Sequence, residues 1–138
     1  MSRPQSPGGA TPPVQAFTAD GTQIDLPPLA RAICARYREE FPDEEERYGP
    51  AGMEWCLHDN QYLLAWAIQD ARDGTIVLSE QAAWLARVLA ARGFPLARLA
   101  RNLEIASEIV AASAGIHDLA QIVSERLAAS AVMVAALR

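Results

Sequence analysis

The chain has 138 residues, enough for one domain with a substantial core but hardly for two. Its net charge of -5 disfavours general binding to the phosphate backbone of nucleic acids. The most apolar run, residues 127–137, is about half as long as a bilayer-spanning helix, so membrane insertion is not expected. No charged start followed by an apolar stretch opens the chain, which disfavours secretion. Cys34 and Cys56 are too few for a disulfide framework and stand in no metal-binding spacing, which favours a reducing cytoplasm.

The first 26 residues mix proline, glycine, serine and threonine with few large apolar groups. Ordering such a segment costs more chain entropy than its burial returns. We therefore expect residues 1–26 to be a flexible tail and residues 27–138 to form a single helical domain. No strand-like alternation of apolar and polar residues follows residue 29.

A first helix is predicted to open at Pro27 and Pro28, because proline is tolerated where backbone N–H groups lack partners. Pro42 ends this helix. The acidic run at 43–47 suits the start of a short helical turn that stops at Gly49-Pro50, with its charges in solvent.

Four longer helices follow, separated at Asp73-Gly74, Gly93 and Gly115. Short connections between long helices predict an all-α fold: an antiparallel four-helix bundle, or a globin-like helical bundle, with an additional N-terminal helix. The four helices are expected over residues 53–71, from an N-cap at Ser79 to Arg92, from Pro95 to Gly115, and onward from Asp118.

The helix over 53–71 carries apolar or aromatic groups on two sides. Asn60 lies within its main buried stripe and must find hydrogen-bond partners there. Asp59 lies among tryptophans on the opposite side, where a dry environment would raise its pKa. Such aromatic lines usually belong to a core or an interface, and otherwise they form the wall of a pocket. The buried stripe comprises Met53, Cys56, Leu57, Leu63, Leu64, Ala67, Ile68 and Ala71, and the second line comprises Trp55, Asp59, Tyr62 and Trp66.

The later helices also carry more apolar residues than the core of a single bundle needs. Ile105 and Ile109 form a second apolar line on the helix that begins at Pro95, and nearly every position from Leu127 onward is apolar or small. The last helix should therefore be buried on most sides, and we expect a homodimer.

Catalytic and metal-binding motifs are absent from the sequence. His58 could join Glu54 in a metal site, but a partly exposed ion pair explains this spacing better, and His117 suits a helix start. A helix-turn-helix around Gly93 fits only in part, because Asn102 would occupy an apolar position. We therefore expect neither an enzyme nor a nucleic-acid-binding protein, and no cofactor is evident.

The order DNQYLLAW, WLARVLAARG and LARNLEIASEIV, within about residues 50 to 112, resembles small all-helical sensor or effector domains of bacterial regulatory proteins. Some of these accompany cobalamin-binding domains, and others are non-haem globin-like domains. The resemblance implies a signal-receiving or partner-binding module, with another regulatory protein as its partner, although no cobalamin-binding unit or axial haem histidine can be named.

The leading expectation is a non-enzymatic regulatory or protein-interaction module that forms a helical homodimer through its aromatic faces. The alternative is a ligand-sensing domain that holds a tetrapyrrole or other hydrophobic small molecule. The residues expected at the interface or the ligand are Trp55, His58, Asp59, Tyr62, Trp66, Trp84, Ile105 and Ile109.

Overall fold

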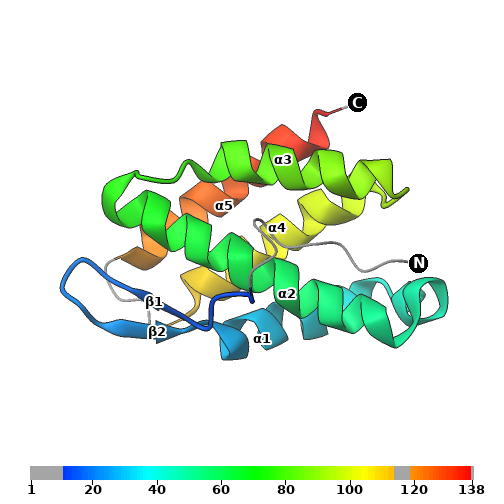
Figure 1. The fold of residues 1–138 in the computed structure, drawn as a ribbon, viewed down its shortest axis with the longest axis horizontal. Helices are drawn as coiled ribbons and strands as arrows, with labels where there is room; N and C mark the ends of the chain where they lie inside the picture. The colour runs from blue at the N-terminus through cyan, green and yellow to red at the C-terminus, as the bar shows by residue number, and fades with distance from the viewer. Residues whose placement is uncertain (1–10, 114–118, 138) are drawn as a thin grey trace.

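The computed structural model describes residues 11–113 and 119–137, and Figure 1 shows their arrangement. Helices make up most of these residues, which confirms the predicted helical class, and a small antiparallel hairpin precedes them. Within the described part of the chain, no helix is long and apolar enough to cross a membrane. The elements are β1 (Gln15–Phe17), β2 (Gln23–Asp25), α1 (Leu26–Glu40), α2 (Glu44–Asp73), α3 (Leu78–Ala91), α4 (Leu96–Ala111) and α5 (Ala120–Ala135).

The hairpin lies within the segment for which composition predicts a flexible tail. Strands β1 and β2 pair with Ala16 opposite Ile24, and Ile24 and Leu26 are buried in the core. The connecting turn satisfies its own polar groups, since the backbone N–H of Thr22 donates to Thr18 Oγ1 at 3.0 Å and to Asp20 Oδ1 at 3.1 Å. The buried side chains of Ile24 and Leu26, and a turn whose polar groups bond to one another, thus give residues 15–26 a defined structure. The average composition of the segment did not predict this.

Glycine and proline set the helix boundaries much as expected. Helix α1 has proline in its first turn. Helix α2 is continuous except at Gly49, whose positive φ of 66° introduces a kink before Pro50. Gly74 and Gly93, with φ of 70° and 80°, end α2 and α3 in the left-handed conformation that glycine adopts readily.

The predicted cap of α3 is wrong. Ser79 lies inside the first turn, and the helix begins one residue earlier, at Leu78. The backbone N–H of Leu78 donates to Asp70 Oδ2 of α2 at 2.8 Å, so a side chain from another helix satisfies this end. The predicted breaks at Gly115 and Asp118, and His117 between them, lie outside the described residues.

Helix α4 packs between α1 and α5, and α3 packs on α5 and α2. Ile105 is fully buried and Ile109 partly buried, so α4 is covered on more than one side, as its two apolar lines indicate. The expectation for α5 is wrong in part. Leu127 and Val134 are buried, but Val132 is 72% exposed, because only one face of α5 meets α3 and α4.

Candidate functional site

A pocket opens where α1, α2, the end of α3 and α4 meet. Its cavity volume is about 60 Å³, and the empty space grows to about 560 Å³ when the open solvent at the mouth is counted. A small molecule bound here would therefore occupy the mouth as well as the interior. Its lining residues are Tyr37, Arg38, Glu44, Tyr48, Gly52, Trp55, Cys56, Asp59, Asn60, Leu63, Leu89, Phe94, Leu99 and Asn102.

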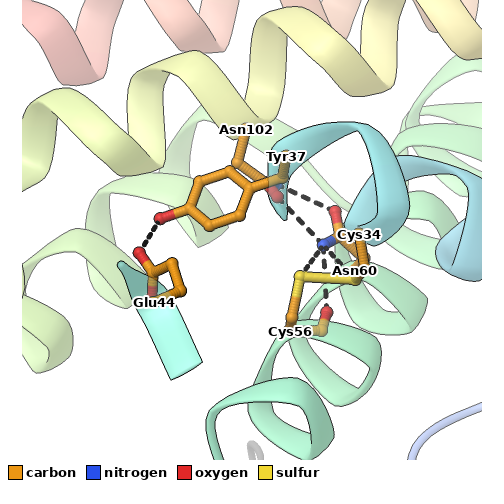
Figure 2. The surroundings of a disulfide bond; sticks show 6 residues. All are labelled: Cys34, Tyr37, Glu44, Cys56, Asn60 and Asn102. Atoms are coloured by element: carbon orange, nitrogen blue, oxygen red, sulfur yellow. Dashed lines mark hydrogen bonds between the residues drawn. A yellow bond between two sulfur atoms is a disulfide. The ribbon is translucent and has the colours of Figure 1, made fainter. Parts of the chain in front are cut away.

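One wall of the pocket is a buried polar cluster. The hydroxyl of Tyr37 donates a hydrogen bond to Glu44, and both side chains are buried (Figure 2). Arg98 of α4 donates to Glu44 Oε1 at 3.0 Å and to Asp43 Oδ2 at 2.9 Å, and its guanidinium lies over the ring of Phe41. The Glu44 charge is therefore matched by a cation and a hydroxyl.

The pKa values of this cluster follow from its contacts. Burial raises the pKa of the Tyr37 hydroxyl, and the hydrogen bond to Glu44 raises it further. The hydrogen bond from Arg98 lowers the pKa of Asp43, and the same bond raises the pKa of the Arg98 guanidinium. These directions indicate a neutral tyrosine and a charged arginine at neutral pH.

A second polar wall joins α2 to α4. Asn60 Nδ2 donates to Asn102 Oδ1 at 3.0 Å, and Asn102 Nδ2 donates back to Asn60 Oδ1 at 2.9 Å. Asn60 Nδ2 also contacts the carbonyl oxygen of Cys56 at 2.9 Å, as Figure 2 shows. This confirms that Asn60 is buried with partners, and it specifies the helix with which α2 pairs at this point.

Cys34 of α1 and Cys56 of α2 form a disulfide, with their Cα atoms 6.1 Å apart (Figure 2). The sequence offered two cysteines as too few for a disulfide framework and did not predict this single bridge. Both residues face the interface between α1 and α2, so a single bridge joins these helices without any larger framework. Because persistent disulfides are typical of oxidising compartments, the pairing weakens the cysteine argument for a reducing cytoplasm.

Aromatic rings form the remaining wall and the mouth. The ring centroid of Tyr48 lies 6.4 Å from that of Trp55 and 5.7 Å from that of Phe94. Gly52 lies beside Tyr48, and a Cβ atom there would come within 2.9 Å of the Tyr48 Cβ atom. The absent side chain at Gly52 therefore allows the Tyr48 side chain to pack closely against the next turn of α2.

Two hydrogen-bond donors of the pocket lining have no acceptor among the residues that the structure describes. The indole Nε1 of Trp55 is buried and unpaired. Arg38 is half-buried in the last turn of α1 and forms no ion pair within the described ranges. Its Nη2 lies 3.4 Å from the point where a Gly52 Cβ would stand.

The structure divides the predicted aromatic line into two parts. Trp55 and Asp59 line the pocket, whereas Tyr62 and Trp66 do not. The Tyr62 ring contacts the rings of His58 and Trp66 in tilted arrangements, at centroid distances of 5.3 Å and 5.5 Å respectively. The other predicted site residues, Trp84, Ile105 and Ile109, pack against the core.

The chain's own N-terminal segment covers the Tyr62 side of α2. Gln61 Nε2 donates to the carbonyl of Pro13 at 2.9 Å, and the Tyr62 hydroxyl donates to the carbonyl of Thr11 at 3.3 Å. Arg72 donates to the carbonyl of Phe17 at 3.1 Å, and Trp66 is only 7% exposed. Shielding of Trp66 therefore does not require a second subunit.

His58 differs from its expected environment. It is buried, and its Nδ1 lies 3.3 Å from Asp59 Oδ1, so its acidic neighbour is Asp59 and not Glu54. The described residues contain no group of three histidine, cysteine, aspartate or glutamate side chains that could hold a metal ion.

Several pocket residues were missed by sequence reasoning. Glu44 belongs to the acidic run that the sequence places in solvent, and no local pattern indicates that Arg98 of α4 binds it. The one signal available was Asn102, a polar residue at a position where a helix-turn-helix needs an apolar one. A polar residue at such a position indicates a buried partner, which proves to be Asn60.

Comparison of the chain with protein families, with curated proteins and with solved structures finds no match. Function must therefore be argued from the pocket, whose aromatic walls and unpaired donors can hold a small molecule by stacking and hydrogen bonding.

Proposed function

We propose that the protein is a non-enzymatic regulatory module that senses a small molecule bound in the pocket between α1, α2, α3 and α4. The observation that carries the proposal is Trp55, a lining residue of the pocket whose buried indole N–H has no acceptor among the described residues. Leaving such a donor unpaired costs about 1–3 kcal/mol. A ligand that supplies an acceptor recovers this energy, which favours the bound state.

The state of the titratable groups supports binding without catalysis. Tyr37 and Glu44 bind each other, Glu44 also binds Arg98, and Asp59 lies beside His58. General acid–base or nucleophilic catalysis needs a group with a free position towards the substrate and a second group that activates it. The described lining residues present no such pair.

The position of the pocket suits signalling. Four helices contribute side chains to it, so a ligand that prefers one arrangement of these helices shifts the population towards that arrangement. Such a shift can be passed to another regulatory protein. We further take α2–α5 as the expected antiparallel four-helix bundle, with α1 as the additional helix, because the described connections between consecutive helices are short.

The proposal is tested with the purified full-length chain, labelled with ¹⁵N and screened against a library of small aromatic molecules. Binders should shift the indole N–H resonance of Trp55, which is assigned with the Trp55→Phe variant. Trp84→Phe is the matched control, because Trp84 lies outside the pocket. We expect Trp55→Phe to weaken binding and Trp84→Phe to leave it unchanged. A library without binders, or binders that leave the Trp55 resonance in place, would overturn the proposal.

A second candidate function, the helical homodimer, is favoured by a different observation. The C-terminal half of α5 exposes small apolar groups around Val132, which is 72% exposed. Such a face suits close packing with a second copy. Sedimentation velocity should then show a dimer that Val132→Glu dissociates, whereas the control Ala97→Glu, at an exposed position of α4, should not. If the parent protein still sediments as a monomer when its concentration is raised about 100-fold, the dimer is excluded.

A further inference from the structure

We infer that the small molecule carries a carboxylate, which binds Arg38 and accepts the hydrogen bond of Trp55, on a flat apolar body. This inference rests on the proposed function and adds the chemical class of the ligand. It is argued from the charges of the pocket, from the position of its two unpaired donors and from its apolar walls.

The acidic groups of the pocket have partners, and Arg38 has none among the described residues. The Glu44 carboxylate accepts hydrogen bonds from Tyr37 and Arg98. Asp59 has His58 beside it. The half-buried guanidinium of Arg38 is thus the charged lining group for which the described ranges supply no partner. A ligand that supplies an anion completes the pairing, whereas a cationic ligand would meet a like charge.

The two unpaired donors belong to adjacent parts of the pocket. Arg38 Nη2 approaches α2 at Gly52, because no side chain stands there. Trp55 follows Gly52 by three residues, and positions three apart lie on the same face of a helix. Arg38 Nη2 and the residue Trp55 therefore border the same section of α2.

The chemistry of these donors selects the head group. A guanidinium presents a planar fork of N–H groups that matches the two oxygens of a carboxylate. A carboxylate has about four acceptor positions, so it can bind this fork and also accept from an indole N–H. A neutral carbonyl could satisfy Trp55 but would leave the Arg38 charge unmatched.

The apolar walls select the body. Tyr48 and Phe94 contribute aromatic rings to the lining, and Leu63, Leu89 and Leu99 contribute aliphatic side chains. Flat aromatic molecules bury most of their surface against such walls. An aromatic carboxylate of one or two rings combines this body with the head group that Arg38 and Trp55 require.

The test compares three carboxylates with their neutral amides: benzoate, 2-naphthoate and indole-3-acetate against benzamide, 2-naphthamide and indole-3-acetamide. Dissociation constants are measured by isothermal titration calorimetry on the full chain, and the Trp55 indole resonance reports the site. We expect at least one carboxylate to bind about tenfold or more tightly than its amide, because charge-assisted hydrogen bonds are about twice as strong as neutral ones.

Variants at Arg38 separate charge from shape. Arg38→Met should remove the preference for the carboxylate, because it weakens carboxylate binding more than amide binding, while Arg38→Lys should keep part of the preference because it keeps the charge. Arg87→Met, at an exposed position of α3 outside the pocket, is the matched control. Circular dichroism melts confirm that each variant folds.

The outcomes distinguish this inference from the proposed function. If library binders that shift the Trp55 resonance are all neutral or cationic, or if Arg38→Met leaves a carboxylate's advantage intact, the ligand class is wrong while the pocket remains a binding site. If no molecule of either set shifts that resonance, both proposals fail. A preference for the carboxylate that Arg38→Met removes and Arg87→Met retains supports both.

Discussion

The disulfide between α1 and α2 should supply a large share of the stability of the fold. Cys34 and Cys56 are 22 residues apart, so the bridge closes a loop of this length in the unfolded chain. The loss of chain entropy on closing such a loop stabilises the folded state by about 3 kcal/mol at 25 °C. Small domains have total stabilities of about 5–15 kcal/mol. Reduction should therefore remove a fifth or more of the total.

The perturbation is reduction with dithiothreitol, and the measurement is urea unfolding followed by circular dichroism. With a urea dependence of about 1–3 kcal/mol per molar, a loss of 3 kcal/mol lowers the unfolding midpoint by about 1–3 M. The Cys34→Ser/Cys56→Ser variant should unfold at the midpoint of the reduced protein, and dithiothreitol should not shift it further.

The reasoning would be refuted by either of two results. Thiol titration of the oxidised, folded protein could detect two reactive thiols, in which case the cysteines are not paired. Alternatively, oxidised and reduced proteins could unfold at the same urea concentration, in which case the bridge does not restrict the unfolded chain as the loop length requires. Because Cys56 lines the pocket, the same samples also show whether reduction changes binding of 2-naphthoate.

Three further predictions concern single side chains. Asn60→Leu should destabilise the fold by about 1–3 kcal/mol in urea unfolding, because the amide of Asn102 loses its buried partner, and Asn60→Leu/Asn102→Leu should recover part of this loss. Gly52→Ala should weaken ligand binding in calorimetry and cost about 1–3 kcal/mol, because the new Cβ would stand 2.9 Å from Tyr48 Cβ. The hydrogen bond from Arg101 of α4 lowers the pKa of Glu40 below its usual 4.5. The Glu40 carboxylate therefore stabilises the fold fully above about pH 4.5, and this stabilisation is lost as the pH falls through the lower pKa of the folded state. Thermal melts of Glu40→Gln should consequently show a shallower loss of melting temperature in acid.

Each of these predictions has an outcome that contradicts it. A double asparagine variant that loses as much as the sum of the single variants would show that the two amides are not coupled. Unchanged binding by Gly52→Ala would show that Tyr48 moves without cost. If the melting temperatures of the parent protein and of Glu40→Gln fall equally with pH in acid, the Glu40 carboxyl has the same pKa in the folded and unfolded states.

Local signals in the sequence predicted most of the helices and several of their ends. Proline in the first turn of α1, and left-handed glycines at 49, 74 and 93, act through the conformation of single residues. Such restrictions hold wherever the chain folds, so they can be read without knowledge of the neighbours. The same is true of the apolar stripe of α2, in which Leu63, Leu64 and Ala67 are buried as their spacing indicates.

The contacts that build the pocket join residues far apart in the sequence. Glu44 belongs to an acidic run that local rules place in solvent, and Arg98 lies 54 residues further on, so nothing near either residue indicates that they pair. The disulfide was missed for a similar reason. A pair of cysteines on two helices can bond only if the packing brings their Cα atoms to about 6 Å, and packing is a tertiary property.

The cover over Tyr62 had no sequence signal at all, and this affects how the tryptophans should be used in experiments. The acceptors for Gln61, Tyr62 and Arg72 are backbone carbonyls, which every residue possesses. Helix α2 has 30 residues, about twice the length of its neighbours, so its two ends meet different parts of the chain. One aromatic line along such a helix therefore need not serve one purpose. Trp66 lies where the N-terminal segment covers α2 and reports on folding, whereas Trp55 lies at the pocket and reports on binding.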